Sequence, residues 1–415
     1  MANSLIANYG SLGVVDNTTS FIALVGNIGV NQSSEALVED PIREAGTFNN
    51  LFTYVPTNTA SVSSTITLRK SLADTALTVT YTSDQTGVKE DTSNSVLFAA
   101  TDEVDYEVTV PTEGGTNTLT ITALAVQFAP TTTGNCFTIL ARTGVSPIDA
   151  TSTSVFHVPN GLGIGTLDES LTKYRIRTAV TSSNFYTNVS VNGRSSSTVY
   201  RTRKSAANGN QTVTYTSSQT GVKEDTSNTD SLAAGDDYNY VIEYGTGTGT
   251  LTTLIIATRI ISTSNFFPLL TARPQESFAA NTVRYLGVSG NLDLPTTTEA
   301  NSQVYPRFDF TASELGAYVS ANAGVSLATN ITLRDNGVGS ALTIQYLAGQ
   351  TGLKNDSVNT VAITSGTDEI NYEITCLDLT GGITVTWMGI LGETAAAAPP
   401  ATIFPKSTLL FMGAG

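Results

Sequence analysis

Short runs of alternating apolar and polar residues recur along the whole chain. The segment LTVTYT (77–82) places Leu, Val and Tyr on one side and threonines on the other. The segments VDYEVTV (104–110) and INYEIT (370–375) alternate in the same way, which places Asp105 on the polar side of its strand. A period of two predicts β-strands that bury one face.

Turn residues separate these strands, and signals for helices are scarce. Glycine-rich clusters stand at 113–117 (EGGTN), 245–250 (GTGTGT) and 380–382 (TGG). The best helical candidate is the segment 33–46 (SSEALVEDPIREAG), but Pro41 interrupts it. We therefore expect a chain built from short strands.

One acidic segment occurs three times. TYTSDQTGVKEDTSNS (80–95) returns as TYTSSQTGVKEDTSN (214–228) and, with more changes, as GQTGLKNDSVNT (349–360). The glycine that follows Gln-Thr is Gly87, Gly221 or Gly352, so successive copies are about 130 residues apart. Such a long spacing is typical of a repeated domain and too long for the unit of a solenoid.

The flanks of this segment repeat in phase with it. An arginine precedes each marker glycine at a constant distance in the sequence, and a tyrosine follows it at a nearly constant distance. These residues are Arg69, Arg203 and Arg334, followed by Tyr106, Tyr240 and Tyr372. A whole domain of about 130 residues was therefore copied.

Seven or eight short antiparallel strands in such a domain predict a β-sandwich. A jelly roll is favoured over an immunoglobulin fold because the Cys-Trp-Cys framework is missing. The predicted fold class is all-β, with three tandem antiparallel jelly-roll sandwiches. The expected domains are 1–130 (an N-terminal arm with module 1), 131–262 (module 2), 263–395 (module 3) and 396–415 (a linker and docking strand).

Composition and charge narrow the range of functions. Apolar residues make up 40% of the chain, enough for buried cores, and only 13% of residues are charged. The net charge of -15 disfavours binding to nucleic acids and to anionic membranes. Cys136 and Cys376 stand in different modules, so we expect free, buried thiols. The N-terminus lacks the features of a secretory signal, and no apolar run is long enough to span a membrane.

The repeated loop offers the main candidate for a metal site. Its carboxylate and amide oxygens are of the kind that calcium binds. The candidate ligands are Asp91, Asn94, Asp225, Asn228, Asp356 and Asn359. The alternative is an Asx-type turn, in which each aspartate binds neighbouring backbone amides.

We expect no catalytic site and no other cofactor. His157 is the only histidine, and no motif of a hydrolase, P-loop or zinc protease is present. GLGIG (161–165) is not followed by a helical pattern, so we interpret it as a turn. The carboxylate pairs Asp102-Glu103 and Asp236-Asp237 recur at equivalent turns, where a solvated turn is favoured over glycosidase chemistry.

The segment from TLRK to VDYEV (67–108) resembles a group of jelly-roll modules from structural proteins of tailed phages and related viruses. LRDNG (333–337) and AAGDD (233–237) fit their pattern, whereas KSLAD (70–74) and AATDE (99–103) depart from it. The modules are also broadly similar to the trimeric C1q/tumour-necrosis-factor-like jelly rolls. The resemblance implies a virion structural protein that is made in the host cytoplasm, with a trimeric homo-oligomer as the analogous assembly.

The two ends of the chain are candidates for contacts with partners. STLLFM (407–412) follows an AAAAPP linker and is apolar and strand-like. It could return to its own chain or add to a sheet edge of a neighbour. The segment 3–15 (NSLIANYGSLGVV) raises the same two possibilities.

The sequence thus favours a non-enzymatic part of a virus particle. The preferred interpretation is a capsid-decorating, head-fibre or vertex component of a tailed phage, which binds itself and other virion proteins. The main alternative is a fibre or adhesin that binds a host receptor or surface glycans through exposed aromatic residues, with Tyr186, Tyr200 and Trp387 as candidates. A self-assembling extracellular filament is a third possibility.

Overall fold

The computed structural model describes most of the chain as β-structure. The described residues are 4–15, 17–25, 28, 31–112, 117–131, 135–142, 154–162, 165–262, 266–290, 292 and 295–394. Within them the helical elements are three short 3-10 turns, η1 (Glu35–Leu37), η2 (Glu169–Leu171) and η3 (Glu299–Asn301). The all-β fold class is confirmed.

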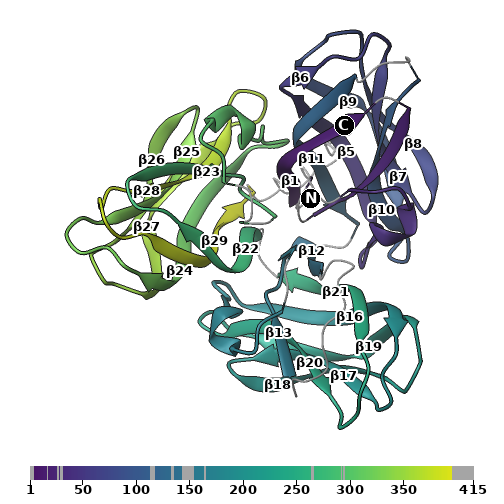
Figure 1. Cartoon of the computed structure of the whole chain (residues 1–415), viewed down its shortest axis with the longest axis vertical. Helices are drawn as coiled ribbons and strands as arrows, with labels where there is room; N and C mark the ends of the chain where they lie inside the picture. The colour runs from purple at the N-terminus through teal and green to yellow at the C-terminus, as the bar shows by residue number, and fades with distance from the viewer. Residues whose placement is uncertain are drawn as a thin grey trace, which may run out of the picture.

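The strands fall into three groups that follow one another along the chain (Figure 1). In the first group, which we call module 1, the strands are β1 (Ser4–Val15), β2 (Thr18–Ala23), β3 (Asn31–Gln32), β4 (Asp40–Pro41), β5 (Gly46–Val55), β6 (Thr57–Asn58), β7 (Ser64–Lys70), β8 (Ala73–Tyr81), β9 (Gly87–Phe98), β10 (Glu103–Val110) and β11 (Thr118–Pro130).

Modules 2 and 3 repeat this arrangement. Module 2 contains β12 (Asn135–Arg142), β13 (Ser154–His157), β14 (Gly161–Leu162), β15 (Tyr174–Arg175), β16 (Val180–Asn192), β17 (Thr198–Lys204), β18 (Ala207–Tyr215), β19 (Gly221–Leu232), β20 (Asp237–Tyr244) and β21 (Leu251–Ser262). Module 3 contains β22 (Phe266–Phe278), β23 (Thr282–Leu286), β24 (Phe310–Asn322), β25 (Thr329–Asp335), β26 (Val338–Tyr346), β27 (Gly352–Ile363), β28 (Ile370–Cys376) and β29 (Ile383–Glu393).

Each module is a two-sheet sandwich with jelly-roll connections. In module 1 the sheet orders are β1-β11-β5-β9 and β2-β10-β7-β8, so the first strand pairs with the last and the second with the last but one. Modules 2 and 3 have the equivalent orders, β12-β21-β16-β19 with β13-β20-β17-β18, and β22-β29-β24-β27 with β23-β28-β25-β26. This nested antiparallel pairing confirms the predicted jelly rolls.

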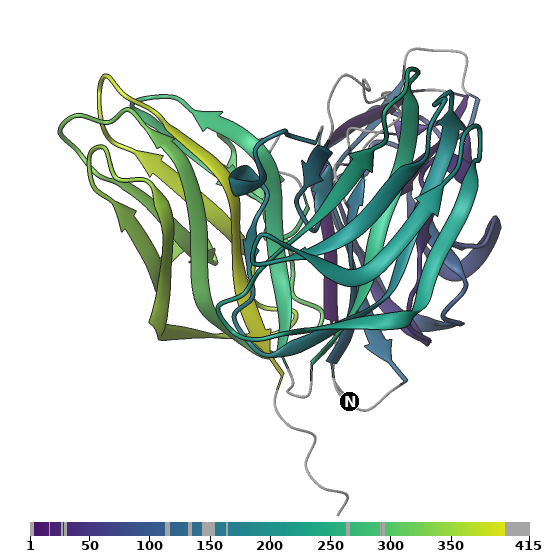
Figure 2. The ribbon, with the colours of Figure 1, turned by 90° about the horizontal axis from the view of Figure 1, so that it is seen from below.

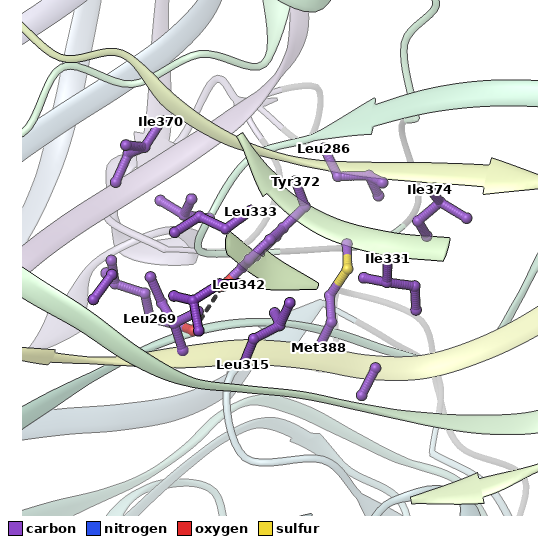
Figure 3. Packing of buried hydrophobic residues seen from close by; sticks show 14 of the residues in the cluster. Leu269, Leu286, Leu315, Ile331, Leu333, Leu342, Ile370, Tyr372, Ile374 and Met388 are labelled. Carbon is purple, nitrogen blue, oxygen red and sulfur yellow. Dashed lines mark hydrogen bonds between the residues drawn. The ribbon is translucent and has the colours of Figure 1, made fainter. Parts of the chain in front are cut away.

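The core of each module lies between its two sheets. In module 3, Leu315 and Met388 from one sheet meet Ile331 and Ile374 from the other (Figure 3). The hydroxyl of Tyr372 donates a hydrogen bond to the Leu269 carbonyl oxygen at 3.3 Å, which satisfies a polar group inside this core. Alternation along the strands therefore supplies both apolar faces.

The segment 33–46 does not form a continuous helix. It contains the single turn η1 and the short strand β4, which pairs with β10 at Pro41. Pro41 has no amide hydrogen and therefore cannot continue a helix. This agrees with the interruption that the sequence predicts at Pro41.

Asp105 differs in burial from the other polar residues of its strand. Its side chain is fully buried, although its strand presents Glu107 and Thr109 as half-buried residues. Neighbouring β4 pairs with the start of β10, and the acidic residues of the preceding turn interact with Asp105. Asp105 lies on the face opposite Val104 and Tyr106, as the alternation predicts, but the segment before β5 covers this end of the sheet and buries it.

The modules stand side by side around a common centre. Figure 1 shows β1, β12 and β22 nearest this centre, and Figure 2 shows the modules beside one another rather than stacked end to end. A small central cavity of about 60 Å³ is lined by residues from all three modules, including Leu5, Asn160 and Phe267. One chain therefore forms a ring with threefold pseudosymmetry.

Candidate functional site

The repeated acidic segment forms the hairpin between β8 and β9 and its counterparts. The Asp91 carboxylate accepts hydrogen bonds from the Thr78 amide (3.2 Å), the Ser93 amide (3.2 Å) and both the backbone (3.1 Å) and side chain (2.9 Å) of Asn94. Asp225 and Asp356 bind Asn228 and Asn359 in the same way. These are the contacts of an Asx-type turn.

Hydrogen bonding lowers the pKa of these aspartates. Partial burial acts to raise the pKa of Asp91, but bonds from Asn94, Thr78 and Ser93 outweigh it and hold the pKa below its usual value. The described residues contain no group of three or more His, Cys, Asp or Glu side chains arranged to hold a metal ion. Calcium binding at these loops stays a prediction, and the cation would compete with N–H donors for the same oxygens.

The arginines and tyrosines that repeat in phase with the acidic segment make contacts within their own modules. Arg69 forms a two-pronged contact with Glu35, with both nitrogen–oxygen distances at 2.9 Å, and thereby holds η1 against β7. Arg203 and Arg334 hold Glu169 and Glu299 in the same way. The tyrosines Tyr106, Tyr240 and Tyr372 are buried in the cores.

A second arginine repeats across the chain, and it links the modules. Arg43 of module 1 lies 5.1 Å from the centre of the Tyr186 ring of module 2, and its Nη1 atom is 2.8 Å from Oε1 of Glu224. Tyr186 and Glu224 stand directly opposite each other on β16 and β19. The buried guanidinium thus binds a ring and a carboxylate that two neighbouring strands present together.

The junction of module 3 with module 1 repeats this contact. Arg307 lies 5.8 Å from the centre of the Phe52 ring, and its Nη1 atom is 2.5 Å from Oε1 of Glu90. Phe52 and Glu90 are opposite each other on β5 and β9. Tyr305 adds a ring contact with Phe52, with the ring centres 5.2 Å apart.

The junction of module 2 with module 3 uses different partners. The equivalent cross-strand pair is Gly316 and Asn355, so both ring and carboxylate are missing. Arg177 instead lies 5.4 Å from the centre of the Trp387 ring and donates a hydrogen bond to the Gly389 carbonyl oxygen at 2.9 Å. A side chain at Gly316 would collide with this guanidinium, because an added Cβ would lie 2.4 Å from Nη2 of Arg177.

Apolar residues surround these arginines. They lie on the sheet that contains the first and last strands of each module, on the face turned away from that module's own core. Phe52 and Ala125 of module 1 belong to the buried cluster of module 3, and Trp387 and Leu270 of module 3 belong to that of module 2. Val25 of module 1 packs in a further cluster with Tyr186, Ile255 and Ala257 of module 2. Each module therefore contacts the next one through a mixed apolar and charged surface.

Together these contacts close a ring. Arg43 reaches module 2, Arg177 reaches module 3 and Arg307 reaches module 1. Successive arginines of this set stand one repeat length apart in the sequence. That spacing could have revealed them, but the sequence alone does not show that their partners lie in other modules.

Further candidate residues from the sequence lie apart from one another. His157 is buried in β13, and burial lowers its pKa to about 4. Asp102 and Asp236 accept backbone amides at equivalent turns and pair with Lys70 and Lys204.

The remaining sequence candidates lie at fixed places in the strands. Cys376 is a buried free thiol, whereas the side chain of Cys136 lies outside the described part of the structure. Within the GLGIG segment, Gly161 and Leu162 form β14, which pairs with β12, and residues 163–164 lie outside the described residues.

The three proposed glycan-binding aromatics are buried. Tyr186 and Trp387 lie at module junctions, and Tyr200 lies in the core of module 2. None of the three forms an exposed stacking surface, so this part of the glycan hypothesis is wrong.

The two ends of the chain differ in what the structure describes. The N-terminal strand β1 pairs with β11 of its own module, so it completes module 1. Residues 395–415, including STLLFM, lie outside the described residues. No helix among the described residues is long and apolar enough to cross a membrane.

Comparisons with known proteins do not assign the chain to a family. No family model matches it, and no curated protein matches it. Among solved structures it aligns with the one described as "The Triple Jelly Roll Fold and Turret Assembly in an Archaeal Virus". The alignment has 13% identity and a TM-score of 0.20, and covers 94% of this chain and 90% of the other. That TM-score is too low to define a shared arrangement of the modules.

Proposed function

We propose that the chain is a non-enzymatic structural protein of a virus particle. Its three modules in one chain act as the equivalent of a trimeric building block. The observation that carries this proposal is the closed ring of junctions made by Arg43, Arg177 and Arg307. Three separate jelly-roll subunits would need concentration to assemble, whereas one chain keeps its modules together. A fused ring can also carry different contacts on each module.

Module 3 supports contact with another protein. Its loops expose Val325 (72%), Leu327 (46%), Leu377 (48%) and Leu379 (73%). These loops adjoin because Asp378 accepts hydrogen bonds from the amides of 325, 326 and 327. In module 2 the corresponding loops contain Ser195 and Thr248, which bind each other. The apolar tip of module 3 favours attachment to a neighbouring virion protein.

The finer proposal is a capsid-decorating, head-fibre or vertex component of a tailed phage. It rests on the sequence resemblance of the modules and on a ring that needs no second copy to close. Attachment would use the tip of module 3 together with residues 396–415, which follow the last described strand, β29. All described strands precede this tail, and we expect the modules to fold without it.

This function can be tested on virus particles purified from a culture that produces the protein. We expect mass spectrometry to find the chain in purified particles, and the variant that lacks residues 396–415 to fold normally but to be absent from them. The double variant Val325→Asp/Leu379→Asp should likewise fold and fail to attach, whereas Val338→Asp, at an exposed valine on β26, should attach normally. Particles that lack the wild-type chain would contradict the proposal.

A further inference from the structure

We propose that the junction of modules 2 and 3 binds a carboxylated monosaccharide unit. A cavity of about 200 Å³ opens there, lined by Ser170, Lys173, Arg175 and Asp237 from module 2 and by Tyr318, Leu353 and Trp387 from module 3. The site adjoins the arginine contact described above, with which it shares Trp387, and is independent of the proposed virion role. Binding pockets often form at such domain junctions.

The cavity presents polar groups without partners. Among the described residues, Lys173 makes no ion pair or hydrogen bond, and neither does the hydroxyl group of Tyr318. Arg175 is already paired with Asp237, its Nε atom 2.7 Å from Oδ1. The lining residues therefore carry a net charge of +1 in a chain with a net charge of -15. A positive, partly desolvated cavity selects an anionic group.

The size and the remaining lining define the rest of the ligand. A lone acetate would leave most of a 200 Å³ cavity empty, yet the cavity is smaller than the pockets of about 300–1,000 Å³ that hold drug-sized ligands. Tyr318 and Leu353 offer a ring and an apolar side chain, and the Tyr318 and Ser170 hydroxyls can bond to sugar hydroxyls. A pyranose ring with one carboxylate matches this combination.

The other two junctions lack this combination. At the junction of modules 1 and 2, Glu39 replaces Lys173 and Asn188 replaces Tyr318. At the junction of modules 3 and 1, Tyr54 stands at the position of Tyr318, but Gln303 replaces the lysine. The cation and the tyrosine meet only where module 2 contacts module 3, which argues against a general feature of the repeat.

The only tryptophan of the chain, Trp387, lies in the wall of this cavity, so its fluorescence reports on occupancy. We expect glucuronate to change the fluorescence of the full chain with a millimolar midpoint, and saturation-transfer NMR to detect the bound sugar. Glucose and acetate, which each supply half of the ligand, should bind at least about fivefold more weakly at low salt.

Variants identify the site. Lys173→Gln should raise the glucuronate midpoint at least about fivefold, and Tyr318→Phe about twofold. Lys204→Gln, at a lysine of module 2 outside the cavity, is the matched control and should leave the midpoint unchanged. Thermal unfolding checks that each variant is folded. No saturable binding by either readout, equal binding of acetate and glucuronate, or a normal midpoint in folded Lys173→Gln would each overturn the proposal.

Discussion

At the residue scale, each of the first two copies of the repeated segment contributes one aspartate to its own hairpin and one glutamate to a module junction. Asp225 shapes the hairpin, and the adjacent Glu224 pairs with Arg43 of module 1. The near-identity of the first two copies therefore coincides with a shared contact, because Glu90 meets Arg307 in the same way. The third copy, which has Asn355 at this position, lies at the junction where the arginine has other partners.

Removing the junction carboxylate should weaken the ring. Arg43 is only 5% exposed, so Glu224→Gln leaves a buried cation without its counter-charge. We expect a loss of about 1–3 kcal/mol in the free energy of unfolding, because Glu224 itself is 35% exposed. The control is Glu243→Gln, in a more exposed pair with Arg201 inside module 2, which should cost less than about 1 kcal/mol in urea unfolding. Equal losses would show that the junction pair has no special role.

Asp105 gives module 1 a pH dependence at a position where modules 2 and 3 carry a neutral asparagine. Burial, together with Glu35 and Glu39, raises the pKa of Asp105 to about 9. This pKa is raised above the value near 4 of an unfolded chain. The stability that protonated Asp105 contributes is therefore fully present below about pH 4 and is lost as the pH rises toward 9. Asn239 and Asn371 occupy the equivalent positions and donate hydrogen bonds to Thr172 and Ser302.

The double variant Val38→Thr/Asp105→Asn copies this neutral pair into module 1. We expect it to be at least about 1 kcal/mol more stable than wild type at pH 8 and to lose the pH-dependent part that Asp105 contributes. Urea unfolding at pH 5, 7 and 8 measures the effect. An unchanged slope of stability against pH would mean that Asp105 is ionised in the folded protein.

At the scale of single elements, alternation and turn residues predicted the strands well. Residues 77–81 and 370–375 lie in strands with buried apolar faces, as their pattern indicates. The pattern did not predict that Asp105 is covered, because the cover comes from the segment before β5, whose Glu35 and Glu39 lie far from β10 in the sequence. It also did not separate core aromatics from junction aromatics such as Tyr186 and Trp387, since both kinds are buried.

The hairpins that carry the repeated segment allow the two interpretations of their aspartates, an Asx-type turn or a calcium site, to be tested. Asp225 accepts the Thr212 amide at 2.9 Å, and the backbone and side chain of Asn228 at 3.1 Å and 2.9 Å. Asp225→Ala should therefore cost about 1–2 kcal/mol through lost hydrogen bonds, and Asp225→Asn should cost less. We expect EDTA to leave the melting temperature of the wild-type chain within about 1 °C. A fall of several degrees that added calcium reverses would support the calcium site.

At the scale of the whole molecule, the repeat predicted three modules but not their arrangement. Tandem domains on short connections can form a line or a ring, and local patterns are the same in both. The difference lies in residues on the outer sheet faces, where Phe52, Tyr186 and Trp387 accept a neighbour's guanidinium. Contacts between modules decide that arrangement, and they appear only once the chain is folded.

Small-angle X-ray scattering of the monomer, separated by size-exclusion chromatography, tests the closed ring most directly. A compact particle of 415 residues should have a radius of gyration of about 22 Å. Three modules of about 14 Å each, strung in a line, would give a radius of about 30 Å or more. At the mass of one chain we predict the compact value, and the larger value of a linear array at that same mass would contradict the ring.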